Sequence, residues 1–164
     1  MDNTVRRVLF LCTGNSARSI LAEALMNVLG KGRFQAHSAG SHPKGAVHPL
    51  ALRTLRSMGV PTRGLRSKAW DEFAAPFPPS IDFVITVCDQ AAGEACPFWP
   101  GAPVTAHWGM PDPAAITGDD ATIARAFLDT ALALKRRIEL MLSLSLDAFD
   151  RPTVQRRVDA IGAS

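Results

Sequence analysis

The chain has 164 residues, of which 47% are hydrophobic, and this is enough for one domain with a full hydrophobic core. No apolar run approaches the length of a membrane span and no secretory leader precedes the first apolar segment, so a cytoplasmic protein is expected. The formal net charge of +3 comes from scattered Lys and Arg without interleaved aromatic residues, which argues against a nucleic-acid-binding protein and suits an anionic substrate.

The first predicted elements are a buried strand and an amphipathic helix joined by a polar loop. Residues 8–11 are a run of apolar side chains typical of a buried strand, and Cys12 follows it directly. A helix is predicted over 17–29, because apolar residues recur on one face at helical spacing. These residues are Ile20, Leu21, Ala24, Leu25 and Val28. The loop therefore lies at the N-terminus of a helix.

This loop has the composition of an oxyanion site with a nucleophile at its start. Backbone N–H groups at a helix N-terminus attract oxyanions, and Arg18 adds a planar fork of donors. The same positive surroundings are expected to lower the pKa of Cys12 from about 8.5 toward ~4–7 and to favour the thiolate. The alternative, a core cysteine beside a surface arginine, does not explain the Gly-Asn-Ser sequence. The predicted oxyanion-binding residues are Thr13, Gly14, Asn15, Ser16, Ala17, Arg18 and Ser19.

The rest of the chain continues the alternation of strand and helix. Strands are predicted where short apolar runs are bounded by turn residues, over 33–38, 81–87 and 104–107. Helices are predicted from apolar residues at helical spacing, over 48–58, 67–73 and 119–146. We expect Ser67 to be the N-cap of the second of these. Residues 89–103 are rich in Gly and Pro and are predicted to form a loop with one helical turn over 90–95.

These elements predict an α/β domain over residues 1–146, with a four-stranded parallel sheet flanked by helices in three layers. Residues 147–164 are predicted to be a polar C-terminal extension with a short helix from Thr153. Open parallel sheets bind their ligands at the carboxyl ends of the strands. Four polar or reactive residues follow the predicted strands and are expected to meet at this rim, namely Cys12, Ser38, Cys88 and Asp112.

The three cysteines, Cys12, Cys88 and Cys96, are too few for the disulfide framework of a secreted protein. They lack the spacing of a zinc site, so no metal is predicted from them. In a reducing compartment they are expected to be thiols that serve catalysis, redox chemistry or core packing. Cys96 lies in a loop bounded by Gly and Pro, which favours movement of a disulfide in that loop.

Several short motifs together resemble a known family. The chain is similar to the low molecular weight protein tyrosine phosphatase superfamily at the loop from Cys12 to Ser19, at Ser38-Ala39-Gly40 and at Pro111-Asp112-Pro113-Ala114. It resembles the thiol-dependent, thioredoxin-coupled arsenate reductases of that superfamily at Val87-Cys88-Asp89, Cys96-Pro97 and His107-Trp108-Gly109. The resemblance covers approximately residues 5–146 and implies the fold predicted above.

The resemblance also implies a reaction and roles for individual residues. It implies that Cys12 attacks arsenate held by Arg18 and the loop amides, with Asp112 as the general acid. Cys88 then attacks Cys12, which releases arsenite and leaves a Cys12–Cys88 disulfide. Cys96 converts this to a Cys88–Cys96 disulfide that thioredoxin reduces. No bound cofactor is implied, and a glutaredoxin or mycoredoxin with a low-molecular-weight thiol is the alternative reductant.

The chemistry favours the reductase over two alternatives. Arsenic(V) accepts two electrons from thiols and phosphorus in phosphate does not, so additional cysteines are useful only to a reductase. A low molecular weight protein tyrosine phosphatase that hydrolyses phosphotyrosine or small phosphoesters is the first alternative, with Cys88 and Cys96 as structural residues. The absence of tyrosine from the chain argues against phosphotyrosine recognition. A non-catalytic oxyanion- or redox-sensing module is the second alternative.

No metal ion is predicted. Some relatives bind potassium beside the loop through an asparagine and a serine, which Asn15 and Ser38 match, but Lys68 stands near the expected carboxylate and opposes a cation. We expect Asn15 instead to shape the loop through hydrogen bonds to nearby backbone groups. The four histidines lack metal-ligand spacing and are predicted to be structural or exposed. They are His37, His42, His48 and His107. Core packing is the predicted role of Trp99 and Trp108.

Overall fold

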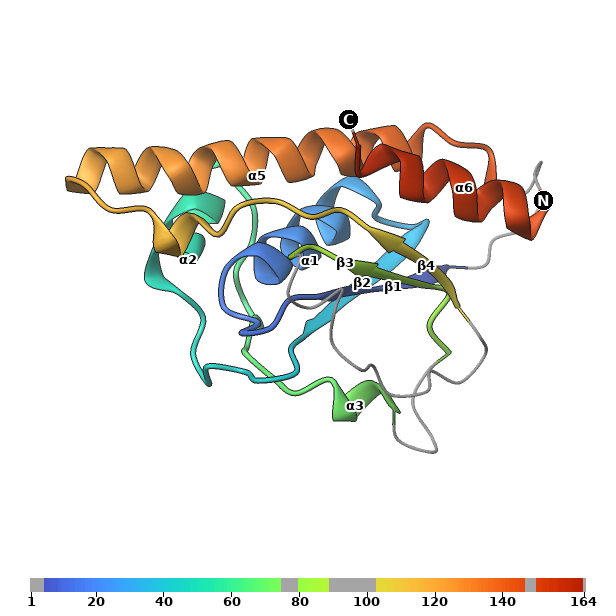
Figure 1. Ribbon diagram of the computed structural model, residues 1–164, viewed down its shortest axis with the longest axis horizontal. Helices are drawn as coiled ribbons and strands as arrows, with labels where there is room; N and C mark the ends of the chain where they lie inside the picture. Colours follow the sequence, from blue (N-terminus) through green and yellow to red (C-terminus); the bar gives the residue numbers. More distant parts are fainter. Residues whose placement is uncertain (1–4, 75–79, 89–102, 147–149, 164) are drawn as a thin grey trace.

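The computed structural model describes residues 5–74, 80–88, 103–146 and 150–163. Its centre is a four-stranded parallel sheet in the order β2-β1-β3-β4 (Figure 1). The strands are β1 (Arg6–Leu11), β2 (Phe34–Ala39), β3 (Phe83–Thr86) and β4 (Val104–His107). Val8 of β1 pairs with Ala36 on one side and with Phe83 on the other. The predicted α/β class and four-stranded parallel sheet are confirmed.

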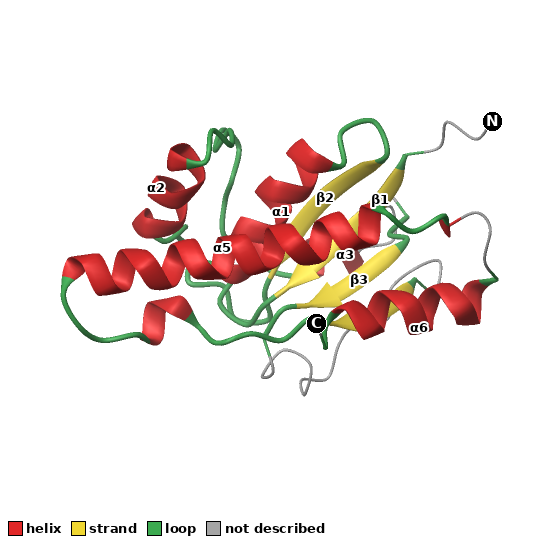
Figure 2. Cartoon of the chain, turned by 90° about the horizontal axis from the view of Figure 1, so that it is seen from above, coloured by secondary structure: helices red, strands yellow, loops and turns green. Residues whose placement is uncertain are grey.

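Helices cover the two faces of the sheet (Figures 1 and 2). On one face lie α1 (Arg18–Leu29) and α5 (Asp120–Leu142), and α5 also contacts α2 (Pro49–Ser57). The other face holds the short α3 (Asp71–Ala74), and the edge strand β4 contacts α6 (Arg151–Ile161). A single 3-10 turn, η1 (Pro113–Ala115), lies between β4 and α5. None of the helices in the described ranges is both long and apolar enough to cross a membrane.

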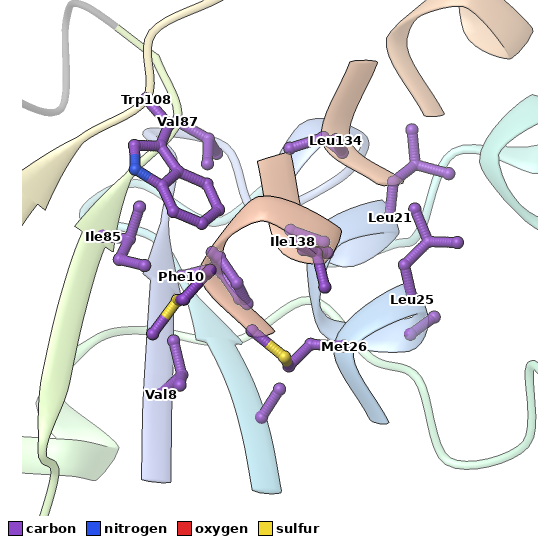
Figure 3. Close-up of a cluster of buried hydrophobic side chains, with 14 of the residues drawn as sticks. Val8, Phe10, Leu21, Leu25, Met26, Ile85, Val87, Trp108, Leu134 and Ile138 are labelled. Carbon is purple, nitrogen blue, oxygen red and sulfur yellow. The ribbon is translucent and has the colours of Figure 1, made fainter. Parts of the chain in front are cut away.

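The main core lies between the sheet and the helices α1 and α5 (Figure 3). Val8 and Phe10 of β1 meet Leu21 of α1 and Ile138 of α5, and none of these side chains is exposed. Trp108, which follows β4, is equally buried, and its ring centroid lies 6.1 Å from that of Phe10. Each side chain of this size stabilises the fold by about 1.5–3 kcal/mol when fully buried. The predicted packing role of Trp108 is confirmed.

The second face of the sheet has a smaller core. Successive side chains of a strand point to opposite faces, so Leu9 and Leu11 lie on the side away from Val8. They pack with Val84 of β3 and with Phe73 of α3. Because β1 is buried on both faces, its sequence is a continuous apolar run and does not alternate with polar residues.

Two predictions about helix residues are wrong. Val28 is predicted to point into the core, but its side chain is 43% exposed. It lies in the last turn of α1 and lines a surface groove together with Pro61. The last long helix ends at Leu142 and does not reach residue 146. Ser143 ends it by donating its hydroxyl to the carbonyl of Leu140 at 2.6 Å.

The short helix predicted over 67–73 is also wrong in its first part, since α3 begins four residues later than expected. Ser67 does not cap it, because its hydroxyl donates to the carbonyl of Gly14 at 3.3 Å. Ala69 forms a parallel bridge with Gly40. This segment is held by the residues that follow β1 and β2, and these distant contacts override its local preference for helix.

Candidate active site

The loop predicted to bind an oxyanion connects β1 to α1. Cys12 follows the last residue of β1, and Arg18 is the first residue of α1. Asn15 has a φ of 42°, so the backbone turns sharply in the middle of the loop. Gly40, which follows β2, must be glycine because a Cβ at this position would overlap the carbonyl oxygen of Thr13. The loop is therefore packed closely against the end of the neighbouring strand.

This loop lines a pocket of about 230 Å³. The pocket brings Cys12, Arg18 and Asp112 together, although Cys12 and Arg18 follow β1 and Asp112 follows the last strand, β4. Ser19 is fully buried and does not belong to the lining. The described lining residues are Cys12, Thr13, Gly14, Asn15, Ser16, Ala17, Arg18, His42, Lys44, Asp112 and Ala114.

The side chain of Asn15 connects the loop to two other parts of the chain. Its Nδ2 donates to the Ser19 hydroxyl at 2.8 Å, and its Oδ1 accepts the Lys68 N–H at 2.9 Å. Asn15 is fully buried, so water does not compete for these bonds. Asparagine also tolerates positive φ better than most residues with a side chain. Asn15 shapes the loop by hydrogen bonding as predicted, but the predicted partners are wrong: they are a side-chain hydroxyl and a backbone N–H distant in sequence, not nearby backbone groups.

A buried ion pair lies next to this loop. The Nζ of Lys68 is 3.6 Å from Oε1 of Glu23, and the two side chains are only 7% and 13% exposed. Ser38 donates its hydroxyl to Glu23 at 2.5 Å. Burial raises the pKa of Glu23 and lowers the pKa of Lys68, while the attraction between them opposes both shifts. Ser38 is thus engaged with Glu23, and the prediction that it lies at the pocket is wrong.

Two of the three predicted relay cysteines lie together. Cys12 and Cys88 are 4% and 2% exposed, and no disulfide joins them. The Thr13 N–H, next to Cys12 in the chain, donates to Sγ of Cys88 at 3.4 Å, and Cys88 has the largest effect on the pKa of Cys12. The two sulfurs meet because β1 and β3 are neighbouring strands and each cysteine follows its strand. The third cysteine, Cys96, lies outside the described residues.

The prediction that the surroundings lower the pKa of Cys12 is wrong for this arrangement. The hydrogen bond with Cys88 and burial both raise the pKa of the Cys12 thiol. Arg18 and the backbone N–H of Gly14 lower it, but their effect is smaller. The sequence argument included the positive groups of the loop and omitted a second thiol in contact with the first.

Replacing Cys88 with alanine is therefore expected to lower the pKa of Cys12. The variant loses the largest contribution that raises this pKa and keeps the contributions of Arg18 and Gly14. Because iodoacetamide reacts with the thiolate, alkylation of Cys12 on the acidic side of the profile is expected to become roughly tenfold faster. Peptide mass mapping of alkylated Cys12 against pH measures this. A profile that stays in place or moves to higher pH contradicts the assigned cause.

Asp112 and Arg18 connect the two sides of the pocket. Nη1 of Arg18 donates to the carbonyl of Met110 at 3.0 Å, and Nη2 lies 3.7 Å from Oδ2 of Asp112. The other carboxylate oxygen of Asp112 accepts the Ala114 N–H at 2.9 Å and caps η1. The Asp112 side chain is 34% exposed, so it is open to the pocket. This places a carboxyl group beside any anion that Arg18 holds.

Two basic residues of the pocket were not among the predicted site residues. His42 and Lys44 are exposed and line the pocket from the segment that follows β2. Their backbone N–H groups donate to the carbonyls of Thr13 and Gly14, both at 2.9 Å. The Lys44 side chain lies over Gly14, where an added Cβ would be 3.2 Å from its Cε. No sequence pattern indicated these two residues, because residues 41–47 have only the composition of a loop.

The substitution Lys44→Gln is expected to slow the approach of anions to Cys12 without changing the thiol. A unit charge about 4 Å away contributes about 1 kcal/mol in water, so the ratio of alkylation rates with iodoacetate and iodoacetamide is expected to fall about fivefold. Lys31→Gln is the control, since Lys31 is exposed and lines a different groove beside α1. An equal fall in both variants contradicts a specific role for Lys44.

The chain is similar to one protein family and to several arsenate reductases. The family model for low molecular weight phosphotyrosine protein phosphatase matches residues 7–145. The chain is 34% identical over 113 residues to an arsenate reductase of Halalkalibacterium halodurans, covering 69% of this chain and 78% of the relative. A structure of an arsenate reductase in the phosphate binding state is 26% identical, with a TM-score of 0.63, and 82% of this chain and 95% of that chain are covered. For a thioredoxin-dependent arsenate reductase of Corynebacterium glutamicum the identity is 27%, the TM-score 0.55 and the coverage 85% and 65%.

Proposed function

The chain belongs to the low molecular weight phosphotyrosine protein phosphatase family, and we propose that within this family it is an arsenate reductase. The observation that carries the proposal is a pair of buried thiols at the oxyanion pocket: Cys12 lines the pocket, and Sγ of Cys88 accepts the N–H of the next residue, Thr13. Hydrolysis of a phosphoester needs one thiol, whereas reduction of arsenate to arsenite consumes two. The similarity to arsenate reductases in sequence and in structure supports the same reaction.

In the first step, the Cys12 thiol gives its proton to the arsenate dianion, and its sulfur attacks the arsenic atom of this substrate, which is held by the backbone N–H groups of residues 13–18 and by Arg18. A bond forms between Sγ and arsenic. One arsenate oxygen leaves as water after Asp112 gives it a proton. Arsenic remains in the +5 state, and no electron has yet been transferred.

In the second step, Cys88 attacks the sulfur of Cys12. A disulfide bond forms and the sulfur–arsenic bond breaks, and its electron pair stays on arsenic. Arsenic is reduced from +5 to +3 and leaves as arsenite, which takes up the proton released by the Cys88 thiol. Two thiols have become one disulfide, which balances the two electrons that arsenic gained. The contact between the two thiols supports this step.

In the third step, Cys96 attacks Cys88, which frees Cys12 and forms a Cys88–Cys96 disulfide. Thioredoxin then reduces that disulfide. Because Cys96 lies outside the described residues, support for this step comes from the sequence and from the similarity to a thioredoxin-dependent arsenate reductase. A low-molecular-weight thiol with glutaredoxin or mycoredoxin is the alternative reductant.

The same pocket is suited to residual hydrolysis of small phosphate monoesters, because Cys12, Arg18 and Asp112 keep their roles when phosphorus is the atom attacked. Phosphotyrosine fits less well. Among the described residues that line the pocket there is no Phe or Trp, and the chain has no tyrosine. A phosphotyrosine ring therefore lacks a Phe, Tyr or Trp partner among the described lining residues.

The test is arsenate-dependent oxidation of NADPH in the presence of thioredoxin and thioredoxin reductase, run beside hydrolysis of a generic aryl phosphate. We expect sustained arsenate turnover and weak hydrolysis. Hydrolysis without arsenate turnover under any reductant identifies a phosphatase and contradicts the proposal. Arsenate turnover that requires a small thiol with glutaredoxin or mycoredoxin keeps the reaction and changes the reductant.

A further inference from the structure

The C-terminal helix α6 begins beyond the family match, which ends at residue 145. It follows an N-cap, Asp150, whose side chain accepts the Thr153 N–H at 2.9 Å. The helix lies beside β4 and contacts α5 (Figures 1 and 2). Its inward side chains belong to the main core, and they are Val154, Val158 and Ile161. This helix is therefore packed against β4 and α5 and contributes to the main core.

Side chains of α6 cover the open edge of β4. The Thr105 N–H donates to Oε1 of Gln155, and the His107 N–H donates to Oδ1 of Asp159, both at 3.0 Å. Gln155 also donates its side-chain amide to the carbonyl of Thr105. The helix thus satisfies backbone groups of an edge strand that a further strand would otherwise pair. These bonds fix β4 as far as the residue before Trp108.

The segment that follows β4 is held by both α5 and α6. The Trp108 indole N–H donates to the carbonyl of Val158 in α6 at 2.8 Å. Arg137 of α5 donates through Nη1 to the carbonyls of Trp108 and Gly109, at 3.0 and 3.3 Å. Its Nη2 donates to the carbonyl of Gly162 at the end of α6, at 3.2 Å. One guanidinium therefore ties the start of this segment to the end of the C-terminal helix.

Gly162 allows this close approach. Its φ is −63°, which any residue adopts in a helix, so the backbone conformation does not require glycine. An added Cβ would, however, overlap the carbonyl oxygen of His107. Even alanine is therefore expected to push the end of α6 away from β4 and from Arg137.

We propose that Arg137 and α6 position Asp112 for proton transfer, an inference that rests on the proposed role of Asp112 as general acid. The path from the anchor to the acid is short in sequence. Arg137 fixes the two residues after β4, and the next residue, Met110, gives its carbonyl to Arg18. Asp112 follows two positions after Met110, and its Oδ2 lies 3.7 Å from Nη2 of Arg18. A shift at the Arg137 anchor therefore moves the acid relative to the oxyanion site.

The first test compares Arg137→Met with Arg137→Lys and with Arg136→Met, an exposed neighbour on the same helix that serves as the matched control. Arg137→Met is expected to lower the single-turnover rate of arsenite formation about tenfold, a fraction of the roughly 100-fold cost of a 1 Å misplacement. Lysine restores part of the rate, because one ammonium lacks the planar fork of donors. Alkylation of Cys12 by iodoacetamide should stay unchanged in every variant.

The same substitution on an Asp112→Asn background separates positioning from a general structural effect. If Arg137 acts through Asp112, then Arg137→Met lowers the rate little further once the acid is absent. Losses that multiply in the double variant overturn the proposal, as does an Arg136→Met variant that is as slow as Arg137→Met.

Deuterium exchange measures the positioning without any substrate. Uptake in residues 109–116 is expected to rise in Arg137→Met and in Gly162→Ala, while uptake in residues 13–18 stays at the wild-type level. Uptake that is unchanged in both variants overturns the proposal. This readout is independent of arsenate turnover, so a failure of the proposed function and a failure of the positioning role are distinguishable.

Discussion

Cys88→Ser is expected to stop multiple turnover of arsenate while leaving Cys12 in place as a nucleophile. Serine is close to cysteine in size and still offers an acceptor to the Thr13 N–H, so the loop is expected to stay folded. A hydroxyl cannot form a disulfide with Cys12, so the two electrons that reduce arsenic are not supplied. Loss of an essential nucleophile typically costs roughly 10³-fold or more. Steady-state NADPH oxidation with arsenate and thioredoxin measures the loss.

Two controls make this result specific to the relay. Cys12→Ser is expected to abolish both arsenate reduction and aryl phosphate hydrolysis, because Cys12 is the nucleophile in each. Cys88→Ser is expected to keep the aryl phosphate hydrolysis of the wild type, which needs one thiol. Arsenate turnover by Cys88→Ser at the wild-type rate contradicts the transfer of electrons through Cys88.

The order and type of the elements follow from local sequence patterns. The strand predicted over 104–107 is β4, and the helix predicted over 48–58 is α2 with one residue fewer at each end. His48 begins that helix because its Nδ1 accepts the Leu50 N–H, a bond between residues only two positions apart in sequence. The errors lie where a distant partner is involved, as for Ser67, whose hydroxyl donates to a carbonyl 53 positions earlier.

The site shows the same division between local and distant information. Residues 12–18 form one continuous stretch, so their composition is sufficient to predict an oxyanion loop. Lys44 comes from a segment whose sequence resembles an ordinary loop, and Lys68 comes from a segment whose sequence predicts a helix. For the ion pair, one signal was present, since Glu23 is a carboxylate within a helix whose buried residues are otherwise mostly apolar.

The C-terminal helix shows how a weak signal is missed. Its overall composition is polar, which is why residues 147–164 are predicted as an extension with no assigned role. Val154, Val158 and Ile161 nevertheless recur at helical spacing and are buried. The hydrogen bonds of Gln155 and Asp159 to β4 depend on the path of the sheet edge, which local pattern does not contain.

Asp112→Asn is expected to slow the first chemical step by roughly 10²–10⁴-fold, the usual contribution of a positioned general acid. Asparagine keeps the shape of the side chain, and its carbonyl oxygen can still accept the Ala114 N–H, so η1 stays capped. The variant lacks the proton that the leaving oxygen needs. Single-turnover formation of arsenite, followed by rapid quenching, reports this step separately from the reduction by thioredoxin.

The leaving group distinguishes proton donation from a purely structural role of Asp112. With aryl phosphates, an activated leaving group such as dinitrophenolate departs without a proton, so Asp112→Asn should slow its release little. An unactivated phenolate needs the proton, so its release should slow by the full factor. Equal losses with both substrates would indicate that Asp112 mainly holds Arg18, to which it lies at 3.7 Å. Unequal losses assign the proton to Asp112 whichever atom, arsenic or phosphorus, Cys12 attacks.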